Sequence, residues 1–337
     1  MTDIDTALSP EIHRIFAGCL TSVDVDVRFK NLAKVVHPDR SRDPRANDAF
    51  TNLNKMRERA VKEMESGVWT GFGENTVTFT TSSAAVAYSY LKKRNGDLGD
   101  EYVSETHLAC VLPNEPFVRK GVDLMNNIIS YAPDNILENA RKYVPVETRL
   151  FKSPLINGKQ LVTIERDAAS AALEDVVNKW GPWDPRSVAW LVSSLCDFTC
   201  FLSTQKIVHL ALTPQNVFVN TEKHSVQVVG GWWFFKPRNA TVERVPNWVH
   251  SSVPNSLFTK KRADVRIDLE SVKALARYCL KGVKDVPRAM DIWLSTPSCD
   301  DAVQEYFKWE RAREVAFGVR KFVDFGHPAA EAYKKEK

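Results

Sequence analysis

The sequence predicts an α+β protein in which a helical N-terminal region precedes a β-rich stretch and a mainly helical C-terminal half. Three observations carry this prediction. Apolar residues recur at helical spacing up to about residue 66, residues 76–81 alternate with a period of two, and apolar helical segments dominate after Asp184. Short strands are expected at residues 107–112, 217–219 and 226–229 within these regions. At 337 residues, the chain is long enough for two or three domains.

Composition and charge argue against nucleic acid, membranes and metals as partners. The formal net charge of +4 is small for this length, so nucleic acid is not an expected partner. No apolar run approaches the roughly 20 residues of a membrane helix, and the acidic N-terminus lacks the apolar core of a signal peptide. The six cysteines are scattered without a C-x-x-C pair, and Cys196 and Cys200 fit small residues of a buried helix better than a metal or redox pair. These features favour the cytoplasm, with no membrane, metal or cofactor expected.

The N-terminal region is expected to form a helical hairpin. Residues 24–37 place one apolar stripe on a helix, whereas Lys30, Lys34 and His37 fall on a different face. Pro38 should end this helix, because proline cannot donate a backbone hydrogen bond and disfavours helix at the residue before it. The two helices should pair antiparallel through two sets of apolar residues: Val25, Phe29, Leu32, Ala33 and Val36 on the first, and Phe50, Leu53, Ala60, Val61 and Met64 on the second.

The loop of this hairpin carries His37-Pro38-Asp39. One interpretation is an ordinary hairpin whose loop happens to contain these residues. The basic helix before them and the short polar loop after them make residues 1–66 resemble the J-domain of DnaJ-type co-chaperones. The resemblance implies that these three residues contact a DnaK-type chaperone and stimulate its ATP hydrolysis, while Lys30 and Lys34 steer an acidic chaperone surface. The sequence has neither a glycine/phenylalanine-rich linker nor a cysteine-rich zinc module, so another kind of effector should follow.

A second motif lies far downstream, where residues 209–216 read His-Leu-Ala-Leu-Thr-Pro-Gln-Asn. This segment resembles the protein-kinase catalytic loop H-R-D-L-K-P-x-N, and the segment at Asp268 resembles the kinase D-x-x-S-x-G element with Lys273 in place of the glycine. The turn in residues 96–102 is similar to one in a divergent bacterial and phage kinase-like group. The resemblance implies a bilobal kinase-like domain, with an N-lobe at 72–165 and a helical C-lobe at 166–330. It also implies that Asp268 is a structural anchor for the loop.

The groups that phosphoryl transfer requires are largely replaced. Ala211 stands at the catalytic Asp position, and Gly230 and Gly231 stand where an acid should bind magnesium. The strand around Val111 contains no lysine, and Asn127 falls near the position of the glutamate that pairs with it. Of these kinase residues, only the asparagine that binds magnesium is present, at Asn216. His209 is expected to be structural, and Trp232 and Trp233 could fill the nucleotide cleft. The resemblance therefore implies a pseudokinase rather than an enzyme, although 209–216 could also be an ordinary turn of an α+β protein.

The sequence thus favours a co-chaperone or adaptor whose kinase-like domain binds an unidentified client or partner protein. A divergent ATP-dependent transferase is one alternative, with catalytic groups relocated to Lys92, Lys93, Asp97, Asp100, Glu222 or Asp264. Another is a phage or bacterial assembly protein that uses both folds as docking modules. The basic cluster at residues 260–262 is interpreted as a solvated surface, and the charged residues 333–337 are expected to fray.

Overall fold

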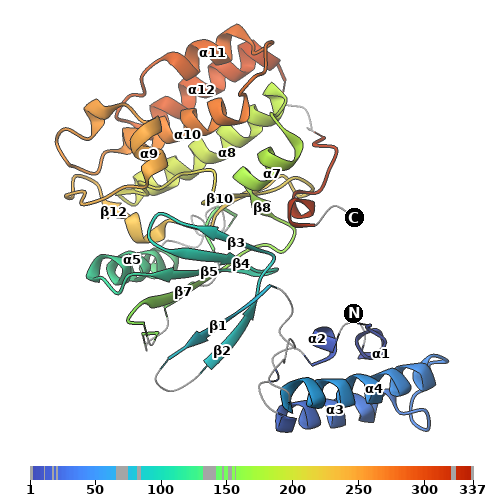
Figure 1. Ribbon diagram of the computed structural model, residues 1–337. Coiled ribbons are helices and arrows are strands. Elements are labelled where there is room, and N and C mark those ends of the chain that lie inside the picture. Colours follow the sequence, from blue (N-terminus) through green and yellow to red (C-terminus); the bar gives the residue numbers. More distant parts are fainter. Residues whose placement is uncertain are drawn as a thin grey trace. The chain divides into compact units, whose positions relative to one another are not determined.

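The α+β class is confirmed by a computed structural model, which contains both helices and antiparallel sheets (Figure 1). The structure describes residues 3–10, 12–16, 19, 22–65, 75–81, 85–131, 142–145, 148–150, 154–155, 157–319 and 324–334. The chain forms two compact units, Met1–Leu91 and Lys92–Lys337. This division lies later than the boundary expected at residues 66–72, because a β-hairpin belongs to the first unit. The glycine-rich break expected there lies outside the described residues.

The first unit is built on a pair of antiparallel helices. Its elements are α1 (Asp3–Ala7), α2 (Ile12–Ile15), α3 (Ser22–Val36), α4 (Ala46–Glu65), β1 (Thr76–Thr80) and β2 (Ala85–Ser89). Val25, Leu32 and Val36 of α3 are buried in one cluster with Leu53 and Ala60 of α4, which confirms the predicted stripes at these positions. Met64 lies where side chains are not described. Burying the two stripes against each other is the main stabilising contribution, since an isolated helix of this length is marginal in water.

Polar contacts fix the short N-terminal helices on α4. The Asn52 side chain donates hydrogen bonds to the carbonyl oxygens of Ala7 and Ser9, at 2.7 and 2.9 Å. Arg45 at the start of α4 forms an ion pair with Asp5 of α1 at 3.0 Å. These contacts satisfy backbone carbonyls that the end of a short helix would otherwise leave without partners.

The second unit contains a five-stranded antiparallel sheet in the order β3-β4-β5-β7-β6. The strands and the helix that follows β5 are β3 (Lys92–Asn95), β4 (Asp100–Val103), β5 (His107–Leu112), α5 (Pro116–Tyr131), β6 (Thr148–Leu150) and β7 (Gln160–Glu165). β5 is buried along its length and lies in the middle of the sheet. The turn expected at residues 96–102 is present but shorter, because Gly96 donates to the carbonyl of Gly99 at 2.9 Å and β4 already begins at Asp100.

Helices form the remainder of the second unit (Figure 1). They are α7 (Leu173–Trp180), α8 (Pro185–Thr204), α9 (Asn247–Ser252), α10 (Val265–Cys279), α11 (Arg288–Ser295) and α12 (Ala302–Phe317). α8 begins at Pro185 after Asp184, whose side chain accepts a capping hydrogen bond from Arg186. By length and composition alone, this helix could cross a membrane, but 56% of its apolar window is buried inside the unit, as in a core helix.

Short elements connect the sheet to the helices. They are β8 (Ala171–Ala172), β9 (Ile207–Val208), β10 (Val217–Asn220), β11 (Ser225–Val228), η1 (Trp232–Phe234), β12 (Lys236–Pro237), η2 (Asn255–Leu257) and η3 (Ala329–Tyr333). β10 pairs with both β8 and β11, and β9 pairs with β12. These pairings hold residues 209–216 between β9 and β10.

The C-terminal segment is ordered at residues where fraying was expected. The Tyr333 hydroxyl accepts a hydrogen bond from the backbone amide of Ala172 at 2.9 Å. The Lys179 ammonium donates to the carbonyl of Glu331 at 2.7 Å. The expectation of a frayed tail is therefore wrong at Tyr333, because its ring and hydroxyl pack on the element that joins sheet and helices. Residues 335–337 lie outside the described chain.

Candidate functional sites

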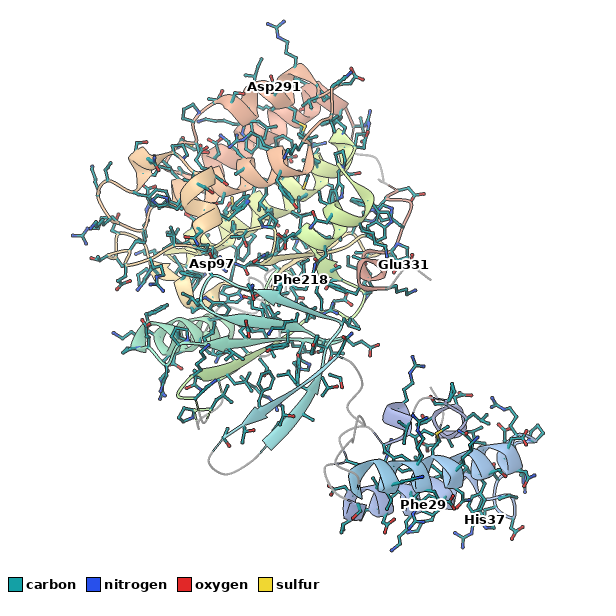
Figure 2. All side chains as sticks on the ribbon, in the orientation of Figure 1. Phe29, His37, Asp97, Phe218, Asp291 and Glu331 are labelled. Carbon is teal, nitrogen blue, oxygen red and sulfur yellow. The ribbon has the colours of Figure 1, made fainter. Side chains whose placement is uncertain are left out.

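His37, Pro38 and Asp39 form a compact turn directly after α3 (Figure 2). The His37 carbonyl accepts hydrogen bonds from the amides of Arg40 and Ser41, both at 2.9 Å. Its Nδ1 accepts a hydrogen bond from the amide of Asp39 at 3.2 Å, which requires a lone pair on this nitrogen. The ring packs edge-on against Phe50 of α4, with centroids 5.0 Å apart. The turn is thus fixed to the helical pair although its side chains remain accessible.

The polar side chains of this turn and of the helix before it are accessible to a partner. The side chains of His37 and Asp39 are 41% and 87% exposed. Lys30 and Lys34 are both exposed on α3, two turns and one turn before His37, respectively. The structure therefore brings the five residues singled out in the first unit to the surface of one helix and its end. A charged partner could approach this surface without any rearrangement.

The second site is the loop at residues 209–216, whose backbone is hydrogen-bonded to Asp268 of α10. The Asp268 carboxylate accepts hydrogen bonds from the backbone amides of His209 and Leu210, at 2.7 and 2.8 Å. Leu210 has a positive φ of 64°, so these bonds stabilise a backbone conformation that leucine rarely adopts. Burial raises the pKa of Asp268 to about 7, while the two amide donors act in the opposite direction. Asp268 therefore contacts the loop backbone and acts as a structural group.

Asn216, Ala211, Gly230 and Gly231 form one buried cluster. The Asn216 side-chain amide donates to the carbonyl of Ala211 at 3.0 Å, and its backbone carbonyl accepts from Val229 at 2.9 Å. Gly231 has a φ of +82°, and a Cβ there would lie 2.7 Å from the Ala211 Cβ. The retained asparagine is thus used to tie two backbone segments together. The space beside Ala211 is filled by the Gly231 backbone.

His209 and Trp232 belong to the core. The His209 ring is fully buried, and its centroid lies 4.7 Å from that of Trp232. Burial lowers the pKa of His209 to about 3, so the imidazole is neutral at physiological pH. The Trp232 indole donates to the carbonyl of Val228 at 3.0 Å. The structure places Trp232 beneath the loop, while Trp233 lines a cavity with Phe117 of α5. Both side chains are almost fully buried, and their role as a plug of a nucleotide cleft stays a prediction.

The turn between β3 and β4 is closed against the sheet. A Cβ on Gly99 would lie 2.0 Å from the carbonyl oxygen of Val111, so the turn backbone packs directly on β5. A Cβ on Gly96 would lie 2.4 Å from a carboxylate oxygen of Glu101. A phosphate-binding turn presents free backbone amides to its anion. Here the Gly96 amide bonds within the turn, and a carboxylate lies beneath it.

Charged side chains join the sheet to the loop. Arg94 and Glu101, opposite each other on β3 and β4, form a buried ion pair at 2.8 Å. Arg94 also donates to the carbonyl of Gln215 at 2.9 Å, and its guanidinium lies 5.7 Å from the centre of the Phe218 ring. Phe218 lies where the sheet meets the helical part (Figure 2). The guanidinium therefore occupies the space between β3 and β10.

The residues considered for a relocated transferase site are not gathered around one point. Lys92 pairs with Asp175 of α7, and Lys93 pairs with Asp100 across the hairpin. Asp97 accepts a hydrogen bond from the backbone amide of Asn247. Asp264 caps the start of α10, and Glu222 lies in the turn between β10 and β11. Lys93 and Asp100 share one contact, and each of the other residues makes its own local contact.

Sequence reasoning missed the Arg94–Glu101 pair. The two residues flank the 96–99 turn symmetrically, so a hairpin register drawn from that turn would have placed them opposite each other. It also missed the buried ion pair between Lys273 and Glu305, which lies at 2.8 Å. These partners are 32 residues apart in sequence, and no local pattern connects them.

Comparison with known proteins finds similarity among solved structures. No protein-family model matches the chain, and no curated protein sequence matches it. Among solved structures, that of vaccinia related kinase 3 is similar, with a TM-score of 0.48 and 14% sequence identity. The similarity covers 71% of this chain and 90% of that chain. At this identity and TM-score, it assigns no activity, substrate or partner to the chain.

Proposed function

We propose that the chain is a co-chaperone or adaptor. In this proposal, residues 1–66 of the first unit act as a J-domain that engages a DnaK-type chaperone through His37, Pro38 and Asp39. The kinase-like second unit, in turn, captures a partner protein without transferring phosphate. The observation that carries the first part is the fixed, accessible turn at His37, which follows a helix with exposed Lys30 and Lys34.

The geometry of the second unit supports the non-catalytic role. Ala211 is fully buried beneath Gly231, and Asn216 bonds to the Ala211 carbonyl. The 96–99 turn is closed over Glu101, and Arg94 fills the space beside Phe218. Phosphoryl transfer depends on placed cations and on a base near the acceptor hydroxyl. The Glu101 carboxylate under the turn is already paired with Arg94, so this guanidinium is not free to bind the phosphates of a nucleotide.

The test is the ATPase rate of a bacterial DnaK-type chaperone with and without the full-length protein. We expect stimulation by the wild type and its loss in His37→Gln. Reversing the helix charges in the Lys30→Glu/Lys34→Glu variant should weaken stimulation, and more so at low salt, because exposed charges act mainly on encounter. Lys62→Glu on α4, which is exposed in the same unit, is the matched control and should retain stimulation.

Two outcomes would contradict the chaperone role. Stimulation that is equal in the wild type and in His37→Gln would show that the turn is not the contact. No stimulation at saturating protein concentration would favour the docking-module alternative, in which both units only hold other proteins together.

A further inference from the structure

Two adjoining cavities of the second unit meet at Glu243 and Arg244, which line both of them. One has a volume of about 420 Å³ and lies between the start of α5 and η1. The other has a volume of about 590 Å³ and lies between residues 241–245 and 258–262. We call this pair of cavities the basic groove. Neither the loop at 209–216 nor the 96–99 turn contributes to it.

The walls of the basic groove are held in place by backbone contacts. Thr241 forms an antiparallel bridge with Arg262, and the Val242 amide donates to the carbonyl of Lys261 at 2.9 Å. The His250 ring stacks on Phe258 with centroids 5.4 Å apart and planes 21° apart. A ligand would therefore meet a surface that is already shaped, which reduces the entropic cost of binding.

The groove carries an excess of positive charge. Six side chains that line it can be cationic: Lys120, Lys236, Arg244, His250, Lys261 and Arg262. Its acidic residues are Glu115 and Glu243, and Glu243 is neutralised by Lys236 at 2.5 Å. The hydrogen bond from Lys236 lowers the pKa of Glu243, and the charges of Lys236 and Lys120 lower it further. Within the described chain, Lys120, Arg244 and Lys261 take part in no ion pair.

Apolar side chains are interleaved with these cations. They are Phe117, Trp233, Phe234, Val242, Val245 and Phe258. Phe234 is held by η1, and Val242 by its bond to Lys261, so both positions are fixed by backbone. Exposed basic patches on polar surfaces suit polyanions in general. Apolar walls between the charges instead favour a peptide whose own apolar side chains can be buried.

We propose that the basic groove binds an extended acidic segment of a partner protein, with aromatic or aliphatic residues interleaved among its Asp and Glu residues. The inference rests on the proposed capture role of the second unit and names the chemistry of the partner. Carboxylates would face Lys120, Arg244 and Lys261, and apolar side chains would enter the two cavities. The pairing of opposite charges would set orientation and encounter rate, and the buried apolar groups would supply most of the affinity.

The test uses the full-length protein and a phage-displayed library of random 12-residue peptides. We expect selected peptides to be rich in Asp and Glu with interspersed Phe, Trp or Leu. Fluorescence anisotropy then measures a selected peptide against Arg244→Glu and Lys120→Glu, each expected to weaken binding by about tenfold or more. Lys284→Glu, an exposed lysine outside the groove, is the control and should bind like the wild type. Replacing the aromatic residues of the peptide by alanine should weaken binding at all salt concentrations.

Several outcomes would overturn the inference. These are selection of neutral or basic peptides, no enrichment at all, or equal binding by wild type and Arg244→Glu. Tighter binding of single-stranded polyuridine than of any selected peptide would assign the groove to nucleic acid instead. Failure of the chaperone assay with intact peptide binding would remove the co-chaperone role and leave the groove. Stimulation of the chaperone without peptide binding would support the co-chaperone role and remove the proposed function of the groove.

Discussion

The Arg94 guanidinium donates a hydrogen bond to the backbone carbonyl of Gln215 at 2.9 Å, and thereby connects the first strand of the sheet to the loop at 209–216. The same side chain forms the buried ion pair with Glu101. One arginine therefore fixes the distance between the sheet and the loop. In a protein that binds nucleotide between these two elements, this space would have to remain open.

Removing Arg94 should strongly destabilise the second unit. Arg94→Met leaves the Glu101 carboxylate buried without its partner, and we expect a loss of about 3 to 5 kcal/mol in the free energy of unfolding. The double variant Arg94→Met/Glu101→Leu should recover much of this loss, because no uncompensated charge remains. Urea unfolding measures both. Equal destabilisation by the single and double variants would show that the contact with Gln215, rather than the ion pair, dominates.

Placing an acid at position 211 should not produce phosphoryl transfer. Ala211→Asp places a carboxylate in a fully buried position that the Gly231 backbone already fills, so we expect a loss of at least about 2 kcal/mol in stability. Ala211→Asn, which has the same shape without the charge, separates crowding from charge burial. Transfer of labelled phosphate from Mg-ATP should stay at background in both variants. Measurable transfer by Ala211→Asp would show that the remaining groups still support phosphoryl transfer.

Acid should destabilise the second unit through His209. Its pKa is about 3 in the folded protein and about 6.5 when unfolded, so the unfolded chain binds a proton that the folded chain excludes. The stabilising contribution is complete above pH 6.5 and is lost as the pH falls toward 3. Between pH 6.5 and 4.5, this single group should cost roughly 2 kcal/mol.

The matched variant for this effect is His209→Phe, which keeps a ring beside Trp232 and cannot titrate. As the pH falls, the thermal midpoint of the wild type should decrease relative to that of this variant, because only the wild type has a buried imidazole that excludes a proton. Asp268 titrates in both proteins, so the difference between the two slopes reports His209. Parallel slopes would contradict the prediction.

Lys273 should be the most important lysine of the helical part. Its ammonium is fully buried, pairs with Glu305 at 2.8 Å and donates to the carbonyl of Thr296 at 2.7 Å. Lys273→Met would leave Glu305 buried without its main partner, with an expected loss of about 3 to 5 kcal/mol. Lys308 contacts the same carboxylate at 3.4 Å but is 51% exposed, so Lys308→Met should cost less than about 1 kcal/mol. Chemical denaturation compares the two, and similar losses would refute this distinction.

Sequence periodicity predicted the helical pair of the first unit well, because burial of one stripe dictates which residues face the partner helix. Val25, Leu32 and Val36 are buried as expected, and Lys30 and Lys34 are exposed. The turn at residues 96–99 was also predictable from its glycines. These features depend on residues close together in sequence.

Contacts between distant residues were not predictable in the same way. The partners of Arg94 and Lys273 include Gln215 and Glu305, which no local pattern identifies. The hydrogen bond of the Trp232 indole to the carbonyl of Val228 was likewise not predicted, and whether Trp232 fills a nucleotide cleft stays a prediction. The expected fraying at Tyr333 was wrong, because the sequence around it is charged and gives no sign of the contact with Ala172.

The bond between Ala172 and Tyr333 spans 161 residues of chain, whereas the bond that fixes Asn52 to Ala7 spans 45. Contacts over long stretches of chain form slowly, because the loop that they close must lose its conformational freedom first. The two units should therefore mature at different times. During synthesis from the N-terminus, the helical hairpin that carries His37 would fold before the segment with Tyr333, which the second unit requires, has been synthesised.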